Sequence, residues 1–334
     1  MKTTHTTNIQ TAADLLHQGE VVAFPTETVY GLGANALSDA AVQKIFTAKG
    51  RPADNPLIVH IGSCSLLPQI VADVPPQAQA LIDAFWPGPL TIVLPKTDAL
   101  SNLVTGGLST VGVRQPAHDT ALALLQTANL PIAAPSANLS GRPSPTTAQH
   151  VLDDLSGKVA AVLDGAHVAI GLESTVIDCT VTPPVILRPG GITAEQIATI
   201  IGNVVVSKSP TNTEDTPKSP GMKYTHYAPQ APMTLVIGDT AFFQSIINRA
   251  REQGNRVGIL VCEEHRDIYQ ADEIVTCGSR EDSATTANRL YHALRTFDAQ
   301  AVDIIYAEPY AETGLGTAIM NRLRKACGDR VIEQ

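Results

Sequence analysis

The chain has 334 residues, which exceeds what one typical hydrophobic core needs and is enough for two domains. Hydrophobic residues make up 44% of the sequence and aromatic residues only 4%, so the core must be built from Ala, Val, Ile and Leu, as suits an α/β protein. With 23 basic and 32 acidic residues the net charge is −9, which argues against tight, sequence-independent binding of nucleic acid.

Over residues 1–206, short apolar segments alternate with segments of helical periodicity. The expected helices are 11–17, 39–49, 78–85, 120–127, 147–155 and 194–201. The expected strands are 21–24, 57–61, 90–94, 111–114, 131–134, 159–163, 175–178 and 185–187. Ser38 and Gly50 are the expected caps of the second helix. This mixture predicts an N-terminal domain with a twisted mixed sheet and flanking helices.

Residues 207–232 are rich in Ser, Thr, Pro and Lys, and are interpreted as a linker. A second alternation follows over 233–334. Its expected strands are 234–237, 257–261, 273–275 and 303–307, and its expected helices are 241–252, 284–297 and 315–325. The order predicts a smaller Rossmann-like domain with a parallel sheet. No G-x-G-x-x-G fingerprint follows its first strand, so the sequence does not support dinucleotide binding there.

The five cysteines are scattered and never form a Cys-x-x-Cys pair. A disulfide framework or a structural zinc site is therefore not expected, and a reducing cytoplasm is. The first residues are polar with no apolar signal core behind them, and no apolar stretch approaches the ~20 residues that span a bilayer. We therefore expect a cytoplasmic protein with no membrane partner.

Three polar segments stand out in the first domain. In 48–57, Lys49 and Arg51 lie at the C-terminus of a predicted helix, where they either complement the helix dipole or grip a polyphosphate. Segment 134–141 follows a strand and is rich in small donors, and segment 24–33 leads from a strand through hydroxyl residues to glycines. Each segment alone fits an ordinary turn. Three of them in one domain favour a ligand site at the ends of the strands.

These segments, with two others, resemble the YrdC/Sua5 family of threonylcarbamoyl-AMP synthases. They are Pro25–Leu32, Lys49–Arg51 with Asn55–Leu57, Trp86–Thr91, Ser136–Asn138, and Ser219–Pro229, which is similar to the connector of the two-domain Sua5 branch. The likeness covers nearly the whole chain. It implies a YrdC-like N-terminal domain, a Sua5-type C-terminal domain, and synthesis of threonylcarbamoyl-AMP and pyrophosphate from ATP, L-threonine and bicarbonate.

The resemblance also implies a set of site residues. The signature and catalytic tetrad is Lys49, Arg51, Ser136 and Asn138. Threonine is expected at Thr28, His60, Arg114 and Ser174. ATP is expected at Arg51, Asn55, Thr110, Ser136, Ser144, Arg188, Tyr224 and Tyr227. Among the residues themselves, Arg114 and Arg188 end strands, where a guanidinium can fork a carboxylate or phosphate, although an ordinary surface Arg at a strand end fits as well.

The implied reaction needs positioning and charge stabilisation more than a covalent nucleophile. Mg²⁺ is expected with ATP. Because no carboxylate cluster with ligand spacing appears, the metal is expected on the phosphates and water, with no protein metal ligand. The product is expected to pass to the tRNA threonylcarbamoyl transferase machinery, which modifies tRNA at position 37, without tight direct binding of tRNA.

The aromatic residues of the linker have two interpretations. Met222, Tyr224, His226 and Tyr227 either dock the two domains together or form a lid that excludes water from the active site. Two other functions are alternatives to the synthase. A double-stranded RNA-binding module would need a basic face, and a carbamoyl-transfer enzyme of hydrogenase maturation would carry zinc-finger cysteine pairs and an acylphosphatase-like domain. The sequence shows none of these features.

Overall fold

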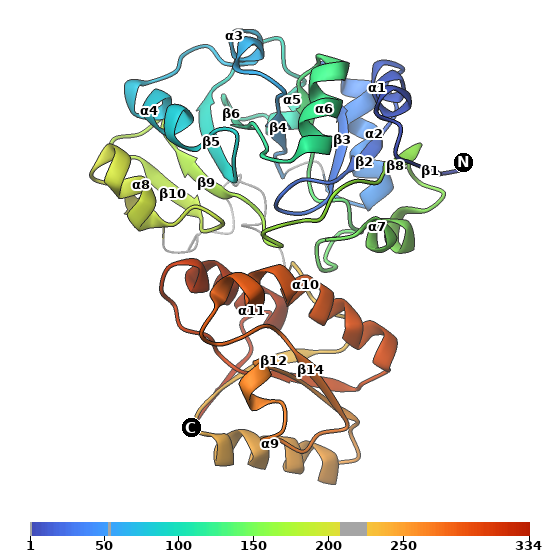
Figure 1. The fold of residues 1–334 in the computed structure, drawn as a ribbon, viewed down its shortest axis with the longest axis vertical. Helices are drawn as coiled ribbons and strands as arrows, with labels where there is room; N and C mark the ends of the chain where they lie inside the picture. Colours follow the sequence, from blue (N-terminus) through green and yellow to red (C-terminus); the bar gives the residue numbers. More distant parts are fainter. Residues whose placement is uncertain (1, 53–54, 208–225) are drawn as a thin grey trace. The chain divides into compact units, whose positions relative to one another are not determined.

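The computed structural model describes residues 2–52, 55–207 and 226–334 (Figure 1). They divide into two units, each considered by itself. The first unit contains the helices and strands up to Val206, and the second contains those from Met233 on, together with the short pieces 141–144 and 170–172. The domain limits 1–206 and 233–334 stay predictions, and most of the expected linker lies outside the described residues.

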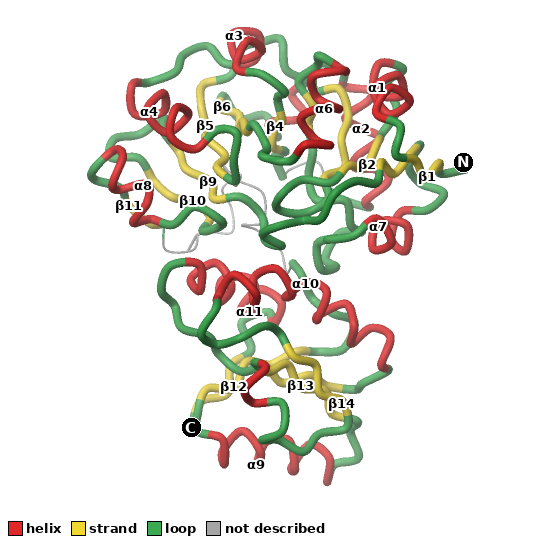
Figure 2. The backbone as a smooth tube through the Cα atoms, in the orientation of Figure 1, coloured by secondary structure: helices red, strands yellow, loops and turns green. Residues whose placement is uncertain are grey.

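An eleven-stranded mixed sheet forms the frame of the first unit (Figure 2). Its strands are β1 (Thr4–Thr6), β2 (Val22–Phe24), β3 (Gly31–Asn35), β4 (Ile58–His60), β5 (Leu90–Pro95), β6 (Thr110–Arg114), β7 (Ile132–Ala133), β8 (Ala161–Leu163), β9 (Thr175–Asp178), β10 (Val185–Arg188) and β11 (Val205–Val206). The order is β1-β8-β2-β3-β7-β4-β6-β5-β9-β10-β11. The sheet contains both parallel pairs such as β4–β6 and antiparallel pairs such as β5–β6, which confirms the expected mixed sheet.

Helices pack on this sheet at both faces. They are α1 (Ile9–His17), α2 (Asp39–Lys49), α3 (Leu67–Ile70), α4 (Pro76–Phe85), α5 (Asn102–Thr105), α6 (Asp119–Ala128), α7 (Ala148–Leu155) and α8 (Ala194–Ile201), with a 3-10 turn at Cys64–Leu66. Helix α2 has the expected caps. Ser38 accepts a hydrogen bond from the Ala41 amide at 3.3 Å, and Gly50 ends the helix in the left-handed region with φ of 60°.

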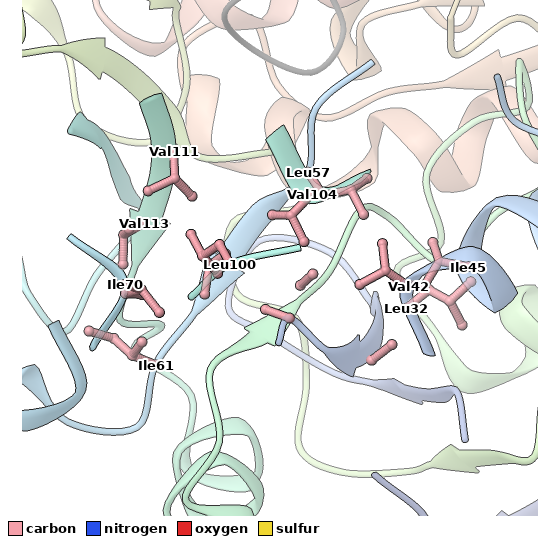
Figure 3. Close-up of a cluster of buried hydrophobic side chains, with 14 of the residues drawn as sticks. Leu32, Val42, Ile45, Leu57, Ile61, Ile70, Leu100, Val104, Val111 and Val113 are labelled. Atoms are coloured by element: carbon pink, nitrogen blue, oxygen red, sulfur yellow. The ribbon is translucent and has the colours of Figure 1, made fainter. Parts of the chain in front are cut away.

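The larger core lies on one face of the sheet (Figure 3). There Val59, Val111 and Val113 of β4 and β6 pack in one cluster with residues of α2, α4 and α5. On the opposite face, α1 and α6 pack over β2, β7 and β8. The same face continues over β4, β5 and β9, where the apolar cluster Ile58, Val93 and Val176 consists of strand residues alone. This strand-only part of the sheet face carries the residues discussed below.

Strand β3 is not among the strands that the sequence predicts, although its first residues belong to the glycine end of segment 24–33. Its sequence Gly-Leu-Gly-Ala-Asn holds no β-branched or aromatic residue, so propensity does not indicate a strand. Tertiary packing selects it instead. A Cβ atom at Gly33 would lie 2.8 Å from both Phe24 and Ile132, so only glycine permits this close approach of neighbouring strands.

The second unit is a five-stranded parallel sheet between helices. Its strands are β12 (Met233–Ile237), β13 (Val257–Val261), β14 (Glu273–Thr276), β15 (Ile304–Ala307) and β16 (Val331–Glu333), in the order β14-β13-β15-β12-β16. Its helices are α9 (Thr240–Glu252), α10 (Ser283–Gln300) and α11 (Leu315–Cys327), with a 3-10 turn at Glu263–His265. All its strand pairs are parallel, which confirms the Rossmann-like class. Within the described part of the chain, no helix combines the length and the apolar character that crossing a bilayer requires.

Candidate functional site

Strand alternation places His60 and Arg114 on the strand-only face of the sheet. In β4, Ile58 and His60 point opposite to Val59, and in β6, Gly112 and Arg114 point opposite to Val113. The two strands are parallel, and His60 lies directly across from Arg114. Both residues therefore lie at the carboxyl ends of their strands, at the edge of the sheet that these ends form, and their side chains lie on the same face.

Arg114 is buried and forms an ion pair with the carboxylate of Glu27. Its Nη2 donates to Oε2 of Glu27 at 2.5 Å, and its Nη1 donates to the hydroxyl of Thr28 at 2.9 Å. The exposed fractions of the Arg114 and Glu27 side chains are only 4% and 6%. Glu27 was missed as a site residue by the sequence prediction. The available signal was that it is the one charge in the apolar and hydroxyl run from Phe24 to Leu32.

His60 is buried beside this pair as a neutral ring. Burial, reinforced by the positive charge of Arg114, lowers its pKa from 6.5 to about 3. The ring meets the edge of Phe24 at a centroid distance of 6.0 Å. Neutral imidazole offers one donor and one acceptor, so His60 can recognise a hydroxyl group without adding charge.

Ser174 is brought to the same edge by β9. Its hydroxyl lies 2.8 Å from that of Thr91, and Thr91 precedes Ile92, which pairs with Val113 beside Arg114. Arg188 fixes Ser174, because its Nε and Nη2 donate to the Ser174 carbonyl at 3.1 and 3.0 Å. The structure therefore gathers all four predicted threonine ligands, Thr28, His60, Arg114 and Ser174, although their binding role stays a prediction.

Three buried polar atoms at this edge have no hydrogen-bond partner among the described residues. They are Oε1 of Glu27, Nε of Arg114 and Nδ1 of His60. An unpaired buried polar group costs about 1–3 kcal/mol, so a cluster of them is expected to bind a ligand or water. Together they offer an anionic acceptor, a cationic donor and a neutral ring nitrogen. We call Glu27, His60 and Arg114 the Glu27 cluster.

Lys49 has a different environment from the one that the sequence suggested. Its ammonium is buried and donates to the carbonyl oxygens of Ser136 and, at 2.5 Å, Asn138. The Asn138 side chain in turn donates to the Leu139 carbonyl at 2.7 Å. Lys49 thus organises the 136–138 loop, and a direct contact of Lys49 with phosphate stays a prediction.

The predicted ATP ligands Arg51, Asn55 and Thr110 lie toward the other end of the same strand pair. Arg51 Nη2 donates at 3.2 Å to the carbonyls of both Asn55 and Pro56, just before β4, and Thr110 begins β6. The Asn55 Oδ1 is buried with no partner in the described ranges. Thr110 and Arg114 are four positions apart in β6, so about 13 Å of strand separates this group from the Glu27 cluster. That length suits a substrate with two separated polar ends.

Two other predicted ATP ligands, Ser144 and Tyr227, belong to the second unit. Ser144 is fully buried. The ring of Tyr227 lies 5.2 Å from that of Tyr291 and 5.7 Å from the guanidinium carbon of Arg322. The structure gives Tyr227 a packing role, and its contact with ATP stays a prediction. Tyr224 and Met222 lie outside the described residues, as does most of the suggested lid.

The second unit holds another buried carboxylate, at the carboxyl ends of β13 and β15. Ligand atoms of Cys262, His265 and Glu308 lie within 4.8 Å of one another, the one such metal-type group within residues 2–52, 55–207 and 226–334. The oxygens of Glu308 are fully used. His265 Nδ1 and the Tyr269 hydroxyl meet Oε1 at 2.5 and 2.7 Å. The Cys262 amide donates to Oε2 at 3.3 Å. We call this arrangement the Glu308 cluster and interpret it as a structural hub.

Comparison with known proteins matches both units to described families. Residues 14–190 match the family model described as "Telomere recombination", which covers Sua5, YciO and YrdC proteins. Residues 192–328 match the model described as "Threonylcarbamoyl-AMP synthase, C-terminal domain". The two matches follow one another along the chain, as expected for the two-domain branch.

Full-length relatives are also similar. The chain is 54% identical to the threonylcarbamoyl-AMP synthase of Bacillus subtilis, over 98% of this chain and 95% of that protein. It is 49% identical to the enzyme of the same name from Pyrococcus abyssi, over 97% and 95%. The crystal structure of P. abyssi Sua5 complexed with L-threonine superposes with a TM-score of 0.94 at 47% identity and covers all of both chains.

Proposed function

The chain belongs to the two-domain Sua5 family of threonylcarbamoyl-AMP synthases, and we propose that it performs that synthesis through the residues of its first unit. ATP, L-threonine and bicarbonate are converted to threonylcarbamoyl-AMP and pyrophosphate. The observation that carries the proposal is the match of both units, in order, to full-length enzymes of that name at 54% and 49% identity.

The mechanism begins with threonine at the Glu27 cluster. Arg114 receives the substrate carboxylate, and Thr28, His60 and Ser174 surround the side chain and its hydroxyl. The threonine amine attacks the carbon of bicarbonate or CO₂ to give a carbamate. The carbamate oxygen then attacks the α-phosphorus of ATP, and pyrophosphate leaves. Because both steps need alignment and charge stabilisation, the chain contributes prearranged cations and donors rather than a nucleophile.

The nucleotide is held toward the start of β4 and β6. Arg51 and Asn55 lie there, and the Asn55 Oδ1 is a buried acceptor available to a ligand. Lys49 acts by holding the 136–138 loop in place, so that Ser136 and Asn138 meet the phosphates. Arg188 acts on Ser174 and thereby links the nucleotide end to the threonine end.

Mg²⁺ is proposed to accompany ATP. In the described part of the first unit, no three His, Cys, Asp or Glu ligands converge, so the residues fit a metal carried on the phosphates and water rather than in a protein cage. The metal supplies charge neutralisation of the phosphate oxygens when bound.

We also propose that the product passes to the transferase that modifies tRNA position 37, and that the enzyme acts in the cytoplasm.

Direct product detection tests the proposed function. The full chain is incubated with ATP, L-threonine, Mg²⁺ and labelled bicarbonate, and the products are separated. We expect a labelled adenylate and pyrophosphate, both of which disappear when threonine is omitted. Pyrophosphate release without threonine, or a product with no bicarbonate label, would contradict the proposal.

A further inference from the structure

We propose that Glu27 binds the α-ammonium of the substrate and accepts its proton as the carbamate forms. This inference rests on the proposed function and adds a catalytic residue to it. It starts from the contact that Glu27 makes with Arg114, through one carboxylate oxygen only, at 2.5 Å. The other oxygen, Oε1, is buried and has no hydrogen-bond partner among the described residues.

The unpaired atoms of the Glu27 cluster match the groups of a free amino acid. Arg114 Nε is an unused cationic donor and suits a carboxylate, whereas Glu27 Oε1 is an unused anionic acceptor and suits an ammonium. The two residues are ion-paired through Nη2 and Oε2 at 2.5 Å, so a cationic donor and an anionic acceptor lie side by side, as the two charged groups of an α-amino acid do. The pair is therefore complementary to a zwitterion rather than to a simple carboxylic acid.

Charge balance supports the same assignment. A buried charge without a partner is costly, whereas a buried neutral pair that receives a neutral zwitterion leaves no net charge uncompensated. Neutral His60 adds no charge to this sum. If Glu27 served only to orient Arg114, the substrate ammonium would be left without an anionic partner.

The chemistry needs a proton acceptor at this position. An ammonium has no lone pair, so the threonine nitrogen must give up a proton in order to attack carbon. With bicarbonate, the first N–H proton passes to Glu27, the N–C bond forms, and the second proton leaves with the displaced hydroxide as water. One carboxylate becomes a carboxylic acid, and atoms and charge balance. A carboxylate is a weaker base than an amine, so transfer is completed as the N–C bond forms.

The test compares threonine with 3-hydroxybutyrate, which is threonine without its ammonium. Both are titrated calorimetrically into the full chain and into Glu27→Gln. We expect the wild type to prefer threonine by roughly 10- to 100-fold, since a charged hydrogen bond is lost with the analogue. In Glu27→Gln this preference should disappear. Glu308→Gln is the matched control, a buried carboxylate outside the site, and should keep the wild-type preference.

Kinetics separate proton transfer from simple orientation of Arg114. We expect Glu27→Gln to lower kcat by about 10²-fold with an unchanged KM for ATP. Glu27→Asp retains the charge and should keep part of the preference for threonine, which provides a second variant if Glu27→Gln does not fold. Equal affinity of the wild type for both ligands, or equal weakening of both in Glu27→Gln, would overturn the proposal.

The same experiment distinguishes this inference from the proposed function. If the wild type releases no threonine-dependent pyrophosphate, the proposed function itself fails. If the wild type releases it and Glu27→Gln retains both the preference for threonine and the wild-type kcat, only the role of Glu27 fails.

Discussion

Glu27 in the first unit and Glu308 in the second are both buried, and the two glutamates differ in how their oxygens are used. Glu27 is paired through one oxygen, and Arg114 and His60 beside it each keep a buried nitrogen without a partner in the described chain. Glu308 is more completely bonded, with His265 and Tyr269 on one oxygen and the Cys262 amide on the other. The difference indicates which buried charge is built for a ligand and which is built for the fold.

The largest effect is expected when Lys49 is replaced by Ala. The carbonyls of Ser136 and Asn138 lose a buried ammonium, and the loop that they belong to loses its position. We expect turnover to fall by roughly 10²-fold or more, and Arg51→Ala to lose a similar factor. Steady-state pyrophosphate release measures both. Lys44→Ala is the control, because Lys44 is in the same helix but forms only an exposed pair with Glu20. Unchanged turnover in both variants would show that Lys49 and Arg51 do not contribute to catalysis.

A smaller effect is expected for Arg114→Lys. An ammonium cannot serve Glu27, Thr28 and a substrate carboxylate with the planar geometry of a guanidinium. We expect KM for threonine to rise by about 10-fold or more and KM for ATP to change little. Arg280→Lys, at the Glu308 cluster, should leave both constants near their wild-type values. A defect confined to ATP would move Arg114 to the nucleotide.

Glu308→Gln should show the opposite profile from Glu27→Gln. It disturbs a set of satisfied hydrogen bonds, so we expect the stability of the second unit to fall by about 1–3 kcal/mol while threonine affinity is retained. Tyr269→Phe removes one bond of the same cluster and should give a smaller loss. Urea unfolding and threonine titration of each variant measure the two properties. Loss of threonine binding in Glu308→Gln would erase the distinction between the clusters.

The smallest effect is a dependence of stability on pH. The pKa of His60 is lowered to about 3, while the unfolded chain titrates this group near 6.5. Between these values only the unfolded state takes up the proton, so stability falls as pH drops from 6.5 toward 3, by at most about 1.4 kcal/mol per pH unit. The charged group that acts on the ring is Arg114, which is paired with Glu27. Unfolding midpoints at pH 7 and 5 should differ less in His60→Gln than in the wild type, and an equal difference would argue against a buried neutral His60.

Much of the fold was predictable because apolar runs and helix caps are local signals. Strands β9 and β13 and helix α8 have the predicted limits, since each is a short apolar or amphipathic run with clear ends. The edge strands β1, β11 and β16 were missed, because two or three residues carry too little periodicity to register. Strand β3 was missed because its glycines are selected by Phe24 and Ile132 of neighbouring strands.

The candidate site was predictable where a motif marks it and not where two distant segments meet. Thr28, His60, Arg114 and Ser174 came from the resemblance, and the structure gathers them at one edge. The partnership of Glu27 with Arg114 spans 87 positions in the sequence, so no local pattern contains it. The loop-holding contacts of Lys49 span 87 and 89 positions and were inaccessible for the same reason.

A crystal structure of the full chain with and without threonine would test the central claim most directly. We expect threonine density at the Glu27 cluster, with its carboxylate on Arg114 and its nitrogen within hydrogen-bond distance of Glu27 Oε1. The Glu308 cluster should be the same in both structures. Threonine bound elsewhere, or a water that stays on Glu27 Oε1 while the threonine nitrogen contacts another group, would contradict it.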